Sequence, residues 1–129
     1  MATFTNSDLD ELVYVKLPPG YQRRGRLWKL RKALYGLRRS PLLWYRLVRS
    51  KLKELGLDVI NEDLCIATNG RITVFWHVDD INVMFHPRDL NEATELQNSL
   101  RKQFELTGGK PILNFLKIDL RRNPIQRKL

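Results

Sequence analysis

The sequence predicts an α+β fold in which helices pack on one face of an antiparallel sheet. Two segments, residues 41–55 and 89–104, repeat apolar side chains at helical spacing, and several short runs are rich in β-forming residues. The dipeptide Asn69-Gly70 separates two of these runs and is the strongest hairpin signal in the chain. Of the 129 residues, 43% are hydrophobic, so residues 1–129 are expected to form one domain with a packed core.

The first expected elements are two strands and a helix. Residues 13–17 alternate in character and stop at Pro18-Pro19-Gly20, and residues 26–30 alternate in the same way. The pair Ser40-Pro41 is typical of a helix start with Ser40 as the N-cap. Apolar side chains then recur on one side of the helix as far as Gly56, while the other side is basic.

A hairpin and a third strand are expected in the middle of the chain. The hairpin joins residues 65–68 to residues 71–77, and residues 81–86 form the next strand. Cys65 lies in the first of these runs, so we expect its thiol to be buried and inert. Because it is the only cysteine, an intrachain disulfide and a thiolate metal cluster are both excluded.

The last third of the chain predicts a second helix, a strand and a tail. Asp89 and Glu92 have the spacing of a capping box, and the helix they open continues to Phe104. The apolar stretch over residues 112–120 predicts a single strand. Residues 121–129 are polar and basic, and we expect them to form a flexible tail.

Targeting signals are missing from the sequence as given. The longest apolar runs fall well short of the roughly 20 residues that cross a bilayer. The first residues lack the basic start and apolar core of a signal peptide. An intracellular location, cytoplasmic or nuclear, is therefore expected.

Positive charge is concentrated in one segment. The chain has 23 Lys and Arg against 14 Asp and Glu, for a net charge of +9. Thirteen of the bases fall between Lys16 and Lys53, a segment without an acid. Such a segment would attract the phosphates of a nucleic acid, with an affinity that falls steeply as salt rises. The alternative is a solvated basic surface with no defined ligand.

The adjacent carboxylates Asp79 and Asp80 lie between two apolar β runs, at an expected hairpin tip. Mg²⁺ prefers hard oxygen ligands and uses one or two protein carboxylates together with substrate phosphates. A polar turn with no ligand is the simpler interpretation of the pair. The surrounding excess of phosphate-attracting bases favours a site for two-metal phosphoryl transfer instead.

Several blocks of the chain stand in a characteristic order: Pro18-Pro19-Gly20-Tyr21, the stretch from Lys32 to Leu37, Val78-Asp79-Asp80-Ile81, and Phe115-Leu116. In these blocks the chain resembles the reverse transcriptase domain of copia-type long-terminal-repeat retrotransposons, from about Asn6 to Leu120. Val78-Asp79-Asp80-Ile81 stands where the family carries Tyr-Val-Asp-Asp. The resemblance implies an incomplete, palm-like reverse transcriptase fold and RNA-directed DNA polymerase chemistry with Mg²⁺.

The same resemblance implies roles for individual residues. Asp79 and Asp80 would be two of three carboxylates that hold the metal pair, and Tyr35 and Gly36 would line the nucleotide pocket. Trp44 and Tyr45 are expected in the core rather than stacked on bases. Nucleic acid would bind non-specifically, as RNA or DNA, to a set of eight bases: Arg23, Arg24, Arg26, Lys29, Arg31, Lys32, Arg38 and Arg39.

Several positions depart from the family pattern. The family's third aspartate would fall two positions before Met1, so we expect the chain alone to be inactive as a polymerase. His77 replaces the tyrosine of the metal motif, and a tolerated replacement is a simpler explanation than a metal ligand. Arg39 replaces a glutamine, Lys117 replaces a glycine, and Gly108-Gly109 stands where Asp-Leu is usual.

Three functions remain open at this point. The chain could act as a polymerase with a partner that supplies the missing parts, or as a co-opted interaction or oligomerisation protein that binds nucleic acid without catalysis. It could also be a remnant without a selected activity. Loss of flanking subdomains would uncover apolar surface, so we expect self-association into a homo-oligomer.

Overall fold

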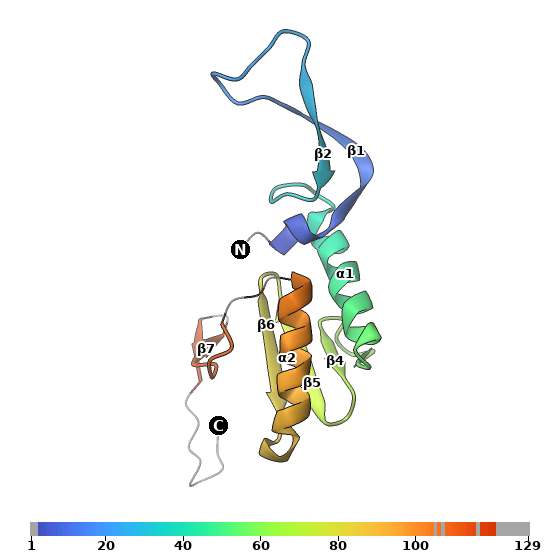
Figure 1. Cartoon of the computed structure of the whole chain (residues 1–129), viewed down its shortest axis with the longest axis vertical. Helices are drawn as coiled ribbons and strands as arrows, with labels where there is room; N and C mark the ends of the chain where they lie inside the picture. The colour runs from blue at the N-terminus through green and yellow to red at the C-terminus, as the bar shows by residue number, and fades with distance from the viewer. Residues whose placement is uncertain (1–2, 105, 107, 116, 121–129) are drawn as a thin grey trace.

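The structure is a computed structural model and describes residues 3–104, 106, 108–115 and 117–120. In these described residues, two α-helices and three antiparallel sheets make up an α+β fold, which confirms the predicted fold class (Figure 1). The strands divide into β1-β2, β3-β4-β5-β6 and β7-β8 instead of joining one sheet. The elements, in chain order, are η1 (Thr3–Asn6), β1 (Asp8–Lys16), β2 (Leu27–Lys32), α1 (Ser40–Glu54), β3 (Asp58–Val59), β4 (Ile66–Thr68), β5 (Ile72–His77), β6 (Asp80–Phe85), η2 (Pro87–Asp89), α2 (Leu90–Phe104), β7 (Asn114–Phe115) and β8 (Ile118–Asp119).

The core lies between one face of the four-stranded sheet and the two helices. Ile72, Val74 and Trp76 alternate along β5 and are all buried, as the period of two requires. Helix α1 and helix α2 cover this face, and the rings of Trp44 and Phe104 meet edge to face with centroids 5.1 Å apart. The prediction that both helices pack on one face, with Trp44 in the core, is therefore confirmed.

The opposite face of the sheet carries the short β7–β8 hairpin. Phe75, on the other side of β5 from Trp76, packs edge to face against Phe115 with ring centroids 5.1 Å apart. The prediction of one strand over residues 112–120 is wrong, because two short strands pair across a turn in which Lys117 has φ 67°. This is the position of the family's glycine, and its left-handed backbone is the conformation that glycine adopts without strain.

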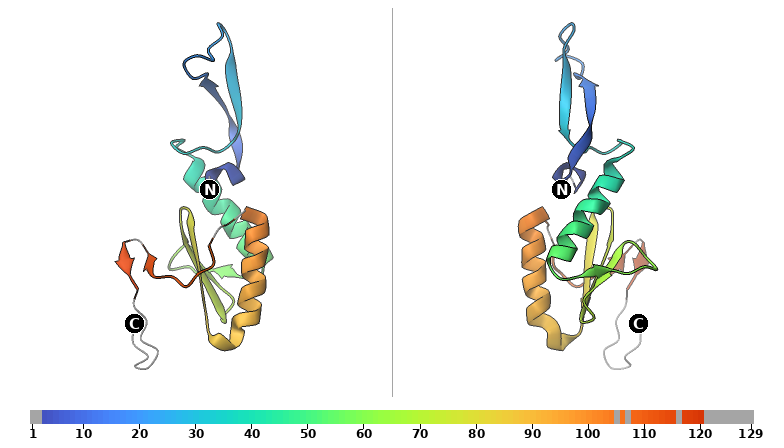
Figure 2. Two further views of the ribbon diagram at one scale, coloured as in Figure 1. Left: turned by 60° about the vertical axis from the view of Figure 1, so that its left-hand side comes forward. Right: turned by 90° about the vertical axis from the view of Figure 1, so that its right-hand side faces the viewer.

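Strands β1 and β2 form a two-stranded hairpin, here called the arm (residues 8–32), that projects away from the rest of the molecule (Figures 1 and 2). At its base, the N–H of Ala33 donates to the carbonyl of Ser7 at 2.9 Å, and Phe4 is buried in the core cluster. The predicted strands at residues 13–17 and 26–30 are confirmed, although β1 begins earlier, at Asp8.

Helix α1 ends as predicted but begins differently. Gly56 has φ 82°, the N–H of Gly56 donates to Lys53, and the N–H of Leu57 donates to Leu52, which together make a Schellman motif. The prediction of Ser40 as the N-cap is wrong, because Arg39 occupies the N-cap without a side-chain cap bond. The Ser40 hydroxyl is buried and donates to the carbonyl of Leu34 at 2.6 Å.

The predicted capping box before helix α2 is also wrong. Both oxygens of Glu92 accept hydrogen bonds from the β4–β5 turn, from Asn69 Nδ2 at 2.8 Å and from Arg71 Nη1 at 3.0 Å. Asp89 is buried and faces Arg71 and Arg88. These two carboxylates therefore connect the start of helix α2 to the β4–β5 turn. They make tertiary contacts instead of capping the helix.

Two further sequence expectations concern Cys65 and the tail. Cys65 is exposed, so the prediction of a buried thiol is wrong. Partial desolvation, and secondarily the Asp63 carboxylate, raises the pKa of the Cys65 thiol, so the expectation of low reactivity agrees with its environment. The predicted tail at residues 121–129 lies outside the described residues.

Among the helices that are described, none has the length and apolar character to cross a membrane.

Candidate catalytic turn and nucleic-acid interface

Asp79 and Asp80 lie at the tight turn between β5 and β6. His77 pairs with Asp80 across the ladder, so Val78 and Asp79 form the two-residue connection. Both carboxylates are exposed, at the end of the sheet nearest the arm (Figure 1). Val78 has φ 49°, a left-handed backbone that is strained for a β-branched residue. The turn therefore presents two adjacent acidic side chains on a tightly constrained backbone.

Helix α1 is hydrogen-bonded to this turn through Trp44. The indole Nε1 of Trp44, which is only 2% exposed, donates to the carbonyl of Val78 at 2.7 Å. A buried indole needs such a partner, because an unpaired buried donor costs roughly 1–3 kcal/mol. Trp44 thus serves both the core and the turn. Sequence reasoning missed the second function, because only the helical spacing of Trp44 was visible in the sequence.

Tyr35 approaches the turn from the loop between β2 and α1. Its hydroxyl donates to Asp79 and lies 2.6 Å from both carboxylate oxygens. The Tyr35 ring also packs on Phe4, with centroids 4.5 Å apart. Gly36, which follows, has φ 89° and no atom within 4 Å of the place a Cβ would take, so its backbone conformation is what requires glycine.

The turn offers a cation two carboxylates. In the part of the chain that the structure describes, no group of three or more His, Cys, Asp or Glu side chains is placed to hold a metal. Asp79 and Asp80 nevertheless fit Mg²⁺ in chemical type, because they are hard oxygen donors and Mg²⁺ often takes only one or two from a protein. One carboxylate of this pair, that of Asp79, already accepts a hydrogen bond from the hydroxyl of Tyr35.

The structure places the eight predicted nucleic-acid-binding bases in three places. Arg23, Arg24 and Arg26 lie in the loop at the tip of the arm, while Lys29, Arg31 and Lys32 belong to β2 and Arg38 and Arg39 precede α1. Two of the eight are used internally. Lys32 pairs with Asp8 at 2.9 Å, and Arg39 pairs with Asp10 at 2.7 Å. The other six form no ion pair with a described residue.

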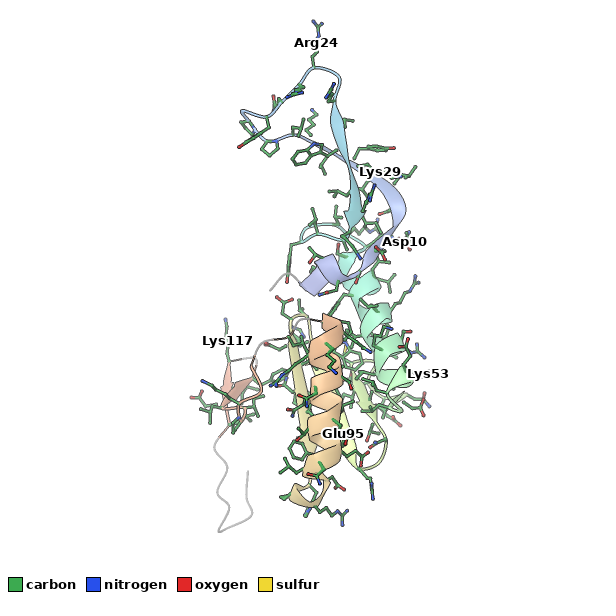
Figure 3. All side chains as sticks on the ribbon, in the orientation of Figure 1. Asp10, Arg24, Lys29, Lys53, Glu95 and Lys117 are labelled. Carbon is green, nitrogen blue, oxygen red and sulfur yellow. The ribbon has the colours of Figure 1, made fainter. Side chains whose placement is uncertain are left out.

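The tip of the arm contains a hollow of about 710 Å³. Four basic residues and no acidic residue belong to its lining: Lys16, Arg23, Arg24 and Arg26. Its remaining lining is neutral, from Gln22, Gly25 and two leucines. Figure 3 shows Arg24 at the far end of the arm, directed away from the molecule. This concentration of unpaired positive charge is suited to an anionic ligand.

Comparison with known proteins identifies the family. A family model described as "Reverse transcriptase (RNA-dependent DNA polymerase)" matches residues 1–129, the whole chain. The chain belongs to this family. Two curated relatives of this reverse transcriptase chain are the Truncated transposon Ty1-A Gag-Pol polyprotein and the Transposon Ty1-DR5 Gag-Pol polyprotein of Saccharomyces cerevisiae, each 30% identical over 105 residues. The copia-type resemblance is therefore confirmed.

The matched region is a small part of those relatives. It covers 81% of this reverse transcriptase chain but only 9% of the Ty1-A protein and 6% of the Ty1-DR5 protein. No solved structure matches the chain. Reverse transcriptases as a family usually use Mg²⁺ and act on nucleic acid, whereas the part that each residue of this chain takes in that work is a matter for proposal.

Proposed function

We propose that this reverse transcriptase chain binds nucleic acid non-specifically through its arm and contributes Asp79 and Asp80, two of three carboxylates, to a Mg²⁺ site for RNA-directed DNA synthesis. The observation that supports the proposal best is the hollow at the tip of the arm, lined by four cations and no acid. None of these four basic residues forms an ion pair with a carboxylate of the described residues. A phosphate can therefore bind them without breaking an internal ion pair.

Asp79 and Asp80 would hold the metal through their carboxylate oxygens. When bound, Mg²⁺ lowers the pKa of an attacking hydroxyl and neutralises the charge of phosphates during transfer. The chain's own residues orient the pair. Trp44 fixes the backbone of the turn at Val78, and the hydroxyl of Tyr35 orients Asp79 until a cation takes its place. Tyr35 and Gly36, beside the turn, would contact the incoming nucleotide.

Arm binding has a specific electrostatic signature. Each phosphate neutralised by Lys or Arg releases counterions and contributes roughly 0.7–0.9 to the slope of log affinity against log salt. Removing three of the cations that line the hollow should therefore remove about two to three from that slope. A cation that merely adds to the overall charge should change the slope far less.

The first prediction tests the arm with two triple variants of the 129-residue chain. Replacing Arg23, Arg24 and Arg26 by Ser should weaken binding of a labelled oligonucleotide and flatten its salt dependence in fluorescence anisotropy. The matched control removes the same charge from the exposed side of helix α1, at Arg46, Arg49 and Lys53. Figure 3 shows Lys53 on the helix, far from the tip. Equal losses in both variants, or a flat dependence in the unaltered chain, would contradict the proposal.

A second candidate function is self-association or protein binding, and one observation favours it. Val13, Val15, Trp28 and Leu30 share one side of the arm by cross-strand register. This apolar side leaves Trp28 55% exposed. An oligomer that forms through this side would appear as a concentration-dependent mass in sedimentation, without any requirement for nucleic acid.

A further inference from the structure

We propose that the arm holds a site for single-stranded nucleic acid, in which the hollow at its tip takes backbone phosphates and Tyr14 stacks on a base. This inference rests on the proposed nucleic-acid binding and narrows it to one side of the arm and one class of ligand.

The strand register divides the arm into two chemically different sides. Tyr14 pairs with Lys29, and Lys16 pairs with Leu27. Directly opposite residues of an antiparallel pair point to the same side, and alternate residues of one strand do so too. Tyr14, Lys16, Leu27 and Lys29 therefore share one side, to which Arg31 also belongs by alternation along β2. The other side is the apolar one that contains Trp28.

Tyr14 stands next to the hollow on the basic side. Lys16 and Leu27, the next pair towards the tip, belong to the lining of the hollow. Two residues along a strand span roughly 6–7 Å, so the Tyr14 ring and the cationic hollow form one continuous surface. Tyr14 is 55% exposed, and Lys29 lies directly opposite it. An aromatic ring bordered by unpaired cations matches a ligand with alternating planar bases and phosphates.

The aromatic ring favours a single strand over a duplex. A two-stranded ribbon also fits the major groove of a duplex, where cations alone would hold it. The bases of a duplex are already stacked on each other, however, so the Tyr14 ring gains little from them. In a single strand a base is free to leave its neighbour and stack on the ring, which adds affinity that does not depend on salt.

The arm provides a matched pair of aromatic residues for the test. Tyr14 and Trp28 are both 55% exposed and lie one row apart on the same hairpin, on opposite sides. Tyr14→Leu should weaken binding of a single-stranded oligothymidylate about five- to tenfold in fluorescence anisotropy, without changing the salt slope. Trp28→Leu should leave that affinity unchanged, and Tyr14→Trp should keep it. Far-UV circular dichroism of each variant checks that the arm keeps its strands.

Tryptophan fluorescence gives an independent measure of the side used. Of the three tryptophans, Trp44 and Trp76 are buried, so a change of solvent-accessible emission reports on Trp28. We expect the oligonucleotide to bind without quenching Trp28. Strong quenching of Trp28 on binding would overturn the inference, because it would place the bases on the apolar side.

Failure of the inference and failure of the proposed function have different signatures. If Tyr14→Leu binds the single strand as well as the unaltered chain, or if a duplex of the same length binds equally tightly, the single-strand site is refuted. The proposed function survives that result when the Arg23, Arg24 and Arg26 variant still loses salt-dependent binding. If the unaltered chain binds neither ligand, both proposals fall.

Discussion

At the scale of single residues, the contact between Tyr35 and Asp79 has the most direct bearing on metal binding. The two residues are 44 positions apart, and the phenol lies 2.6 Å from both oxygens of the carboxylate. Tyr35 is 52% exposed, so water screens this bond and its contribution to stability is small. Its effect on a cation is larger, because the cation and the hydroxyl compete for the same oxygens.

The Tyr35→Phe variant should therefore bind a divalent cation more tightly. A hydrogen bond contributes about 0.5–1.5 kcal/mol net, so its removal should raise the Mn²⁺ affinity roughly two- to tenfold, measured by calorimetric titration. Tyr21→Phe, which changes an exposed phenol in the loop of the arm, is the control and should leave the affinity as it was. A weaker Mn²⁺ affinity in Tyr35→Phe would instead make the hydroxyl part of the metal site.

At the scale of elements, the β5–β6 turn combines strain with support. Val78 has φ 49°, and the left-handed region costs a residue with a Cβ roughly 1–2 kcal/mol. The indole of Trp44 holds the carbonyl of the same residue. The strained turn thus depends on helix α1, which explains how it can present Asp79 and Asp80 in a fixed conformation.

Replacing Val78 by Gly should stabilise the chain by about 0.5–1 kcal/mol. The glycine relieves the left-handed strain, although part of that gain is offset by the greater freedom of the unfolded chain. His77→Gly is the matched control, because His77 is exposed, adjacent and in an extended strand. It should lower the free energy of unfolding by about 0.5–1 kcal/mol. Urea denaturation measures the free energy of unfolding of the two variants. An equal decrease of this free energy in both would show that the turn at Val78 is unstrained.

Elements whose signals were local could be predicted from the sequence. The Asn69 side chain accepts hydrogen bonds from the N–H groups of Arg71 and Ile72, so local contacts already favour the Asn69-Gly70 turn. Helix α2 buries Ala93, Leu96, Leu100 and Phe104 at the predicted spacing. The position of Asp79 and Asp80 in a hairpin turn also followed from the apolar runs on both sides.

The wrong predictions have different causes, and the one for Glu92 is tertiary. Glu92 was expected to cap its own helix, but Arg71, 21 positions away, competes for its carboxylate. Cys65 was expected in a strand, but β4 begins one residue later, at Ile66. The contacts of the candidate site, from Trp44 to Val78 and from Tyr35 to Asp79, join segments 34 and 44 positions apart. No periodicity or spacing within a single segment indicates such pairs.

At the scale of the whole molecule, the arm is stabilised differently from the four-stranded sheet and its two helices. Strand β5 lies between β4 and β6, and Val74 at its centre is fully buried under the two helices. The arm has only its two strands, and Tyr14 and Trp28 remain more than half exposed on its opposite sides. Since isolated two-stranded hairpins are marginally stable in water, the arm should open without unfolding the core.

Native-state hydrogen exchange should therefore separate the two parts. Amides of Tyr14 and Lys29 in the arm should exchange with opening free energies of about 0–2 kcal/mol, and those of Val74 and Phe75 in β5 with about 5 kcal/mol or more. A bound oligonucleotide should slow exchange in the arm and leave β5 unchanged, because a ligand stabilises only the state that binds it. Equal protection of both parts without ligand would make the arm part of the cooperative core, and the conformational entropy lost when it binds would then be small. If the single strand slows exchange only in the arm, at the amides around Tyr14, the least stable part of the fold is the part that binds the ligand.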